Sequence, residues 1–193
     1  MSDPEVIHLP SLDPLYLAVG NGLNAFIRIE GFVAMLYATL MEPAPRLLSI
    51  LSIDAATHVE TKCRIISSVA PYRLERNELK LFNALLGRVK RKADFRNKLA
   101  HWQVGYWHKN MPVGTSREAD ALKPRLMPAY FTAGNIGGKT PESIRPQELQ
   151  EFFDACLVLQ KDLLEFNELI SRSKDEGNKP RHVKGRSVSK KAT

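Results

Sequence analysis

The stretch NAFIRIEGFVAMLYATLM, residues 24–41, decides the fold class of this chain. Its large apolar residues alternate at spacings of three and four, and they are Phe26, Ile29, Val33, Leu36 and Leu40. This period predicts an amphipathic helix whose apolar seam packs inside a helical bundle. Two prolines follow directly in the sequence MEPAP, so we expect the helix to end near Met41.

Three further segments carry a helical pattern. The first is expected over residues 46–69, with a break near Ser52 and with Asp54 as the N-cap of its second part. The next is expected over residues 73–102. The last opens near Pro146, a residue type that favours the first turn of a helix, and its apolar side chains follow a near-heptad pattern.

Residues 103–144 interrupt the helical pattern. Prolines and glycines recur there, and the sequences VGYW and RLMPAYFTA predict two short strands in an irregular hairpin. Residues 173–193 are rich in Lys, Ser and Gly, which is typical of a disordered basic tail. The sequence therefore predicts a mainly α fold, a four-to-five-helix up-and-down bundle over residues 1–172, with a short hairpin-like insertion before the last long helix.

The net charge of +7, from 28 basic and 21 acidic residues, is concentrated in two segments. Residues 73–98 hold nine basic and three acidic residues, and residues 172–193 hold eight basic and two acidic ones. The remainder of the chain is acidic. A polyanion such as RNA is the partner that such segments attract, although a solvated helix face and a solubilising tail have the same composition.

Composition also limits the compartment and the chemistry. No apolar run approaches the roughly 20 residues that span a bilayer, and the N-terminus is acidic, so we expect a cytoplasmic protein with no membrane contact. Cys63 and Cys156 make neither a disulfide framework nor a zinc-site spacing. We expect no metal and no cofactor.

The segment ADFRNKLAHW, residues 93–102, places a charge among the apolar residues of the third expected helix. At about 100° per residue, the apolar side chains of this helix span an arc of about 120°, and Arg96 falls inside that arc. Asn97 lies at its edge and shares one strip of helix with His101, whereas Arg96 and His101 are about 140° apart. A phosphate site between two copies of the helix would combine both side chains, which points to a homodimer.

Arg96 and His101 have the chemistry to cleave RNA without a metal. Arg96 would stabilise charge on the phosphorane, and His101 would act as base on the 2′-hydroxyl or as acid on the leaving 5′-oxygen. The alternative is structural: Arg96 forms a buried ion pair, for example with Glu30, and His101 stabilises the end of the helix.

The sequence RNKLAH, residues 96–101, resembles the Arg-Asn-x-x-x-His signature of HEPN domains, the higher eukaryote and prokaryote nucleotide-binding domains. The resemblance implies a helical bundle that dimerises through the motif helix. Many members are metal-independent endoribonucleases of toxin–antitoxin or anti-phage defence systems, and others bind RNA or nucleotides or serve as scaffolds without catalysis. By this resemblance Arg96, Asn97 and His101 would form the catalytic site, and an antitoxin or defence protein is a candidate partner.

Basic and aromatic residues of the same helix are candidates to bind RNA. They are Arg88, Arg91, Lys92, Lys98 and Trp102. Trp102, with Tyr106 and Trp107 after it, could stack on bases, or it could pack the hairpin onto the bundle, which is the commoner role of such aromatics.

A second motif, AGNIGGKT at residues 133–140, fits a loose phosphate-loop pattern that would bind a nucleotide. Its context argues against this function, because prolines follow at positions 141 and 146, and the chain has little room for the parallel βαβ units that a phosphate loop requires. We expect a glycine-rich turn that leads into the last helix.

Overall fold

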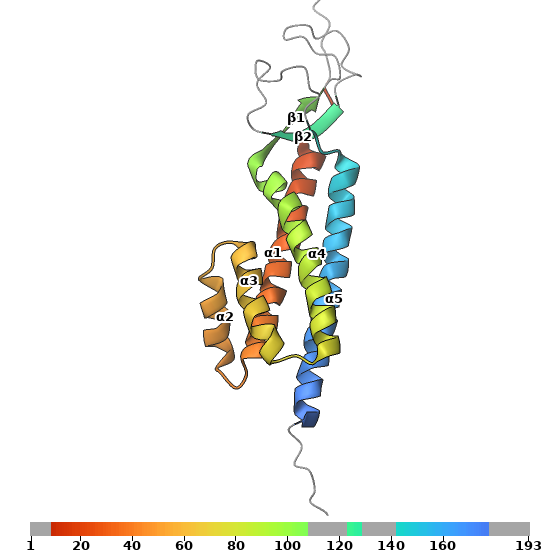
Figure 1. Cartoon of the computed structure of the whole chain (residues 1–193). Helices are drawn as coiled ribbons and strands as arrows, with labels where there is room; N and C mark the ends of the chain where they lie inside the picture. Colours follow the sequence, from red (N-terminus) through yellow and green to blue (C-terminus); the bar gives the residue numbers. More distant parts are fainter. Residues whose placement is uncertain (1–8, 108–122, 129–141, 178–193) are drawn as a thin grey trace, which may run out of the picture.

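Successive helices run in opposite directions along the structure (Figure 1). The computed structural model describes residues 9–107, 123–128 and 142–177. In chain order its elements are α1 (Asp13–Met41), α2 (Arg46–Asp54), α3 (Val59–Val69), the 3₁₀ turn η1 (Ala70–Tyr72), α4 (Arg76–His101), β1 (Trp102–Trp107), β2 (Lys123–Pro128) and α5 (Pro146–Gly177). The predicted mainly α architecture with a small antiparallel sheet is confirmed.

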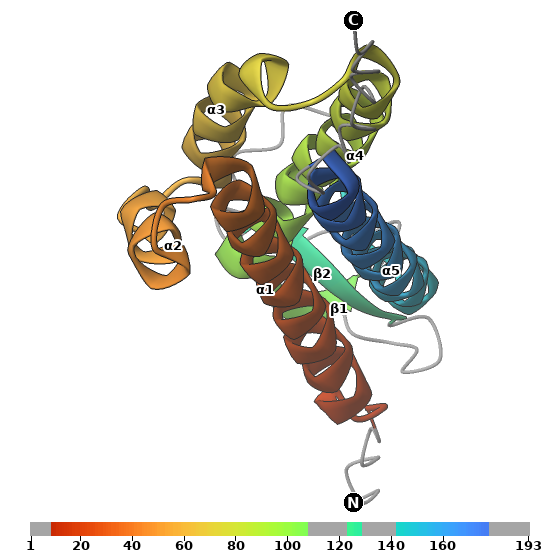
Figure 2. The ribbon, with the colours of Figure 1, turned by 90° about the horizontal axis from the view of Figure 1, so that it is seen from below.

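Helix α1 is the central element of the bundle and packs against all four other helices. Viewed from below, α2 and α3 lie on one side of it, and α4 and α5 lie on the other (Figure 2). All five residues of the predicted apolar seam in α1 are buried. At Gly22 an added Cβ would lie 2.9 Å from Leu99 of α4 and 3.4 Å from Phe152 of α5, so α1 approaches both helices closely.

The bounds of α1 differ from the prediction at the N-terminus. The helix begins at Asp13 rather than Asn24, and it is already in place at Gly20 and Gly22, whose low helix propensity weakens the sequence signal. The backbone N–H of Asp13 donates to the Ser11 hydroxyl at 3.1 Å, and Pro14 occupies the first turn. Both features favour a helix start at this position.

The predicted break in the second helical segment exists, but it lies further along the chain. Asp54 ends α2, and His58 is the N-cap of α3, so the prediction of Asp54 as an N-cap was wrong. The Asp54 carboxylate instead accepts a hydrogen bond from Lys62 Nζ at 2.8 Å, across the α2–α3 connection.

The hairpin and α5 complete the fold. Strands β1 and β2 pair antiparallel from Trp102 opposite Pro128 to Trp107 opposite Lys123, and Leu126 exchanges backbone hydrogen bonds with Ile144 just before α5. The predicted strand VGYW therefore lies in β1, and the first four residues of the predicted strand RLMPAYFTA lie in β2, whereas its residues 129–133 lie outside the described residues. Helix α5 continues to Gly177, beyond the predicted boundary at residue 172. The rest of the insertion and residues 178–193 lie outside the described residues.

Helix α1 also bears on the location of the protein. By length and composition it is apolar enough to cross a membrane, contrary to our expectation from the sequence. However, 56% of its most apolar 18-residue window is buried inside the bundle. Buried core helices share this property, so the helix is weak support for a membrane location.

Candidate functional site

Arg96 lies on the inward side of α4, as the helical geometry predicts. Its side chain is half-buried, and its Nε atom is buried without a hydrogen-bond partner among the described residues. One terminal nitrogen of the guanidinium donates to Asn97 Oδ1 at 3.3 Å. Most N–H groups of the Arg96 guanidinium therefore make no hydrogen bond to the described residues and are available to a ligand.

The guanidinium borders a cavity of about 380 Å³ between α1, α3 and α4. The cavity is lined by Glu30, Thr57, His58, Val59, Glu60, Lys90, Ala93, Asp94, Arg96 and Asn97. Three carboxylates thus share the wall with two permanent cations and an imidazole. The site can bind an anion through its Arg and Lys, and the carboxylates restrict where a highly charged ligand can lie.

Glu30 is paired with Lys62 rather than with Arg96. Lys62 Nζ lies 3.5 Å from the Glu30 carboxylate and 2.8 Å from that of Asp54, and its side chain is only 9% exposed. The ion pair between Glu30 and Arg96 that we considered from the sequence is therefore not formed. The Lys62 network ties α1, the end of α2 and the first turn of α3 together.

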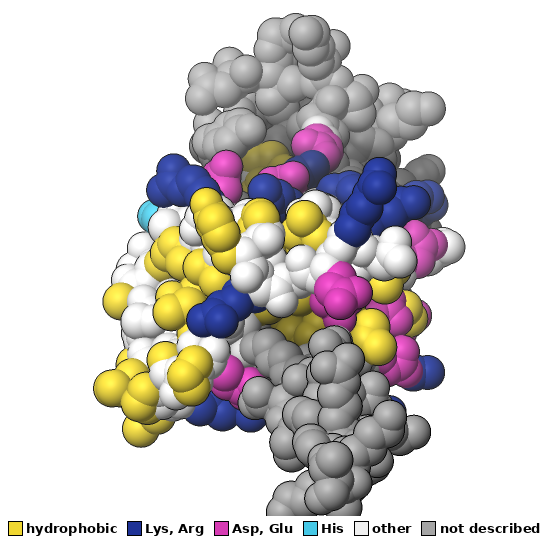
Figure 3. Space-filling model, turned by 60° about the horizontal axis from the view of Figure 1, so that its bottom comes forward, with side chains coloured by type: hydrophobic (Ala, Val, Ile, Leu, Met, Phe, Trp, Pro, Cys, Tyr) yellow, Lys and Arg dark blue, Asp and Glu magenta, His cyan; other side chains and the backbone are white. Residues whose placement is uncertain are grey.

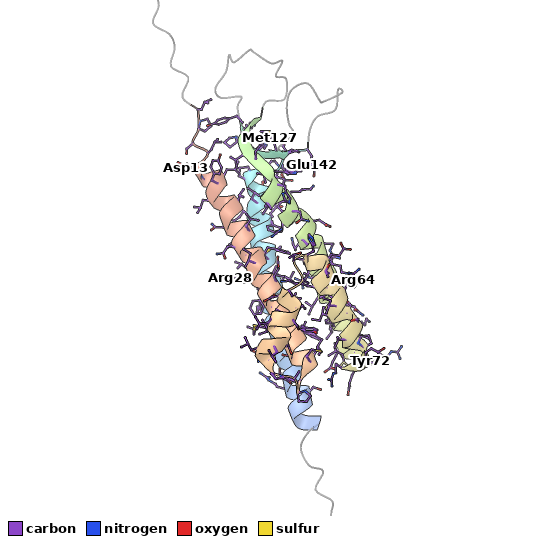
Figure 4. The ribbon with its side chains drawn as sticks, turned by 90° about the vertical axis from the view of Figure 1, so that its left-hand side faces the viewer. Asp13, Arg28, Arg64, Tyr72, Met127 and Glu142 are labelled. Atoms are coloured by element: carbon purple, nitrogen blue, oxygen red, sulfur yellow. The ribbon has the colours of Figure 1, made fainter. Side chains whose placement is uncertain are left out.

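Asn97 and His101 occupy the exposed strip of α4. Asn97 lines the mouth of the cavity, and His101 is exposed one helical turn further on, outside the set of residues that line the cavity. Next to His101, Lys98 pairs with Glu142 and lies 5.3 Å from the centre of the Trp102 ring. Figure 4 shows Glu142 and Met127 at this end of the bundle, near the start of α1 at Asp13.

Three of the predicted RNA-binding residues face α5 instead. Arg88, Arg91 and Lys92 border a groove of about 480 Å³ together with Phe95, Ala155, Val158 and Leu159. Arg88 pairs with Asp162, and Lys92 Nζ lies 5.4 Å from the centre of the Phe152 ring. These cations are brought together by the fold, but on a different side of α4 from the Arg96 cavity.

The aromatic residues after the motif contact the bundle. Trp102 is half-buried and packs against the hydrophobic core, and the Tyr106 hydroxyl donates to the Pro10 carbonyl. This placement agrees with the packing role considered for them in the sequence. The side chain of Trp107 lies outside the described residues.

His58 is the residue of this cavity that the sequence did not identify as a candidate. It lies 38 residues before Arg96 in the sequence, and only the packing of α3 on α4 brings the two together. The only local indication in the sequence was that His58 directly precedes the helical pattern of residues 59–69, which is where an N-cap residue lies.

The cysteines are not candidates for nucleophilic catalysis. Cys63 and Cys156 are free and buried, and burial raises the pKa of both thiols to about 11. Both therefore stay protonated near neutral pH. Within the described parts of the chain, no group of three or more His, Cys, Asp and Glu side chains could hold a metal ion. The phosphate-loop-like segment at residues 133–140 lies outside the described residues.

Comparison with known proteins adds no assignment. No family model matches the chain, and no curated protein and no solved structure shows significant similarity to it.

Proposed function

We propose that this protein is a metal-independent endoribonuclease of HEPN type that acts as a homodimer through α4 in the cytoplasm. One observation carries the proposal. The last turns of α4 hold the half-buried, largely unpaired Arg96 at a cavity, with Asn97 beside it and the exposed His101 one turn beyond Asn97 on the exposed strip. A guanidinium supplies charge stabilisation and an imidazole supplies a proton-transfer group for the transfer of a phosphoryl group to a 2′-hydroxyl.

The surroundings of this site support RNA as the substrate. Residues 73–98, which include almost all of α4, carry nine basic and three acidic residues. Lys and Arg side chains gather across the upper part of the face in Figure 3. Exposed cations attract a polyanion. When they neutralise its phosphates, condensed counterions are released, and this release favours binding at low salt. A toxin–antitoxin or anti-phage defence role, with an antitoxin or defence protein as partner, follows from the resemblance of RNKLAH alone.

A non-catalytic RNA- or nucleotide-binding function is the second candidate. It is favoured by the separation of Arg96 and His101, which face different sides of α4 and do not border one cavity within a single chain. Catalysis by this pair requires either a second copy of the chain or another proton-transfer group on the Arg96 side.

The test is cleavage of mixed-sequence single-stranded RNA in EDTA by the purified protein. We expect the wild-type protein to cleave RNA and His101→Ala to lose at least about 100-fold in rate, because general acid–base catalysis contributes this much or more. His108→Ala serves as the matched control, since His108 lies outside the motif. Equal cleavage by wild-type and His101→Ala, or none by either, would contradict the catalytic proposal; salt-dependent binding without cleavage would favour the second candidate.

A further inference from the structure

His58 lies opposite the motif helix, on the other wall of the Arg96 cavity. It is the N-cap of α3, its backbone carbonyl accepts a hydrogen bond from the Lys62 N–H at 3.0 Å, and its side chain makes no capping hydrogen bond. The imidazole is exposed. The backbone of His58 thus serves the fold, while its ring is left accessible at a cavity that also contains Arg96 and Asn97.

Cleavage of RNA through the 2′-hydroxyl needs two proton transfers. A base removes the 2′-hydroxyl proton as the 2′-oxygen bonds to phosphorus, and an acid gives a proton to the 5′-oxygen as the bond from phosphorus to that oxygen breaks. The products are a 2′,3′-cyclic phosphate and a 5′-hydroxyl. One histidine cannot efficiently perform both transfers at once, because the two oxygens lie on opposite sides of the phosphorus.

We propose that His58 is the second catalytic histidine of this site and works across the scissile phosphate from His101. Asn97 connects the two sides, because it lines the cavity mouth with His58 and lies one turn from His101 on the exposed strip of α4. A phosphate held by Arg96 in this cavity has His58 on the α3 wall, and His101 approaches it from the end of α4, one turn beyond Asn97 and outside the residues that line the cavity. The inference rests on the proposed ribonuclease function and supplies the proton-transfer group that a single chain otherwise lacks on the Arg96 side.

The charged groups around His58 come from three helices. They are Glu30 of α1, Glu60 of α3, and Lys90, Asp94 and Arg96 of α4. Glu30 is held by Lys62 of α3 at 3.5 Å. The test therefore compares pH profiles of variants that leave all of these groups in place.

The first experiment measures kcat/KM for single-stranded RNA in EDTA from pH 5 to 9. We compare wild-type protein with His58→Ala, His58→Asn, His101→Ala and the control His108→Ala. Asn is a preferred N-cap residue, so His58→Asn keeps the start of α3 while it removes the imidazole. We expect a bell-shaped profile for the wild type, and a loss of at least about 100-fold with one limb of the bell flattened in both His58 variants.

The second experiment uses uridine 3′-(4-nitrophenyl phosphate), whose leaving group departs without a proton. Of the two variants His58→Ala and His101→Ala, the one that lacks the general acid should recover most of its rate on this substrate, and the one that lacks the base should not. Recovery in one variant only supports a two-histidine mechanism; full activity of both His58 variants on RNA, with both limbs of the profile retained, would overturn the role of His58 while the ribonuclease function stands. An inactive wild-type protein would overturn both.

Discussion

At the scale of single residues, Arg96 is the position where a charged side chain stands in place of the apolar one that packing would favour. It lies on the side of α4 that otherwise buries Phe82, Leu86 and Val89, and its Nε has no partner among the described residues. A buried donor left unpaired costs about 1–3 kcal/mol. A sequence selected for stability alone would place an apolar side chain at this position, which supports a role for Arg96 outside the folding of the chain.

The unpaired Nε of Arg96 predicts the effect of Arg96→Met. Met has a similar length, no charge and no unpaired donor, so we expect the free energy of unfolding to rise by about 1 kcal/mol while RNA cleavage is lost. Urea denaturation followed by circular dichroism measures the first quantity, and the EDTA cleavage assay measures the second. The exposed Arg91→Met on the α5 side of the helix is the matched control and should change stability by less than about 0.5 kcal/mol. A clear loss of stability in Arg96→Met would show that Arg96 supports the fold.

The sequence was informative about Arg96 for a geometric reason. Positions within one helix are related by a fixed rotation, so the inward placement of Arg96 and the exposed strip of Asn97 and His101 could be predicted from residues 79–101 alone. The cavity and its other wall could not, because Glu30 and His58 reach Arg96 through tertiary packing of α1 and α3. The Glu30–Arg96 pair considered as an alternative is not formed for the same reason: the packing of α3 on α1 places Lys62 Nζ 3.5 Å from the Glu30 carboxylate.

At the scale of helices, Lys62 joins three elements by one buried charge. Its ammonium contacts Glu30 of α1 and Asp54 at the end of α2, and both interactions fix the first turn of α3, which follows directly on the N-cap His58. The Glu30 side chain is only 19% exposed, so it depends on Lys62 for compensation of its charge. The network therefore positions the α3 wall of the cavity.

We expect Lys62→Met to lower the free energy of unfolding by about 3 kcal/mol, because it leaves the largely buried Glu30 carboxylate without its ion-pair partner. The double variant Glu30→Gln/Lys62→Met removes both charges and should recover at least half of that loss. Urea denaturation of the two single variants and the double variant measures the coupling. Additive effects of the two substitutions would contradict a direct interaction between Glu30 and Lys62.

Helix boundaries show which local signals were strong. The prolines after Met41 and at position 146 placed the end of α1 and the start of α5 correctly, because proline acts on its own turn regardless of tertiary context. The N-cap of α3 was misplaced because Asp54, a good capping residue by type, is used in an ion pair instead. A carboxylate such as that of Asp54 can form either a capping hydrogen bond or an ion pair, and only the packing around it decides which of the two it forms.

At the scale of the whole molecule, two exposed surfaces differ in charge. The outer strip of α4 is basic, with Arg76, Lys80 and Lys90 exposed, whereas α2 exposes three leucines without an intervening charge: Leu47, Leu48 and Leu51. Figure 3 shows hydrophobic side chains gathered on the left, the side where Figure 1 places α2. A homodimer through α4 brings like charges together across its axis, while one through α2 does not.

The proposed α4 dimer should therefore strengthen as the salt concentration rises, because counterions screen the repulsion between the two basic helices. Sedimentation or light scattering at micromolar concentration should report twice the chain mass of 21.7 kDa at 0.5 M salt and a smaller average mass at 0.05 M. Lys80→Glu should raise the dimer fraction at low salt, whereas Leu48→Glu on α2 should leave it unchanged. Loss of the dimer in Leu48→Glu, with no effect of Lys80→Glu, would place the interface on α2, and a monomer of 21.7 kDa at both salt concentrations would refute a site shared between two copies of α4.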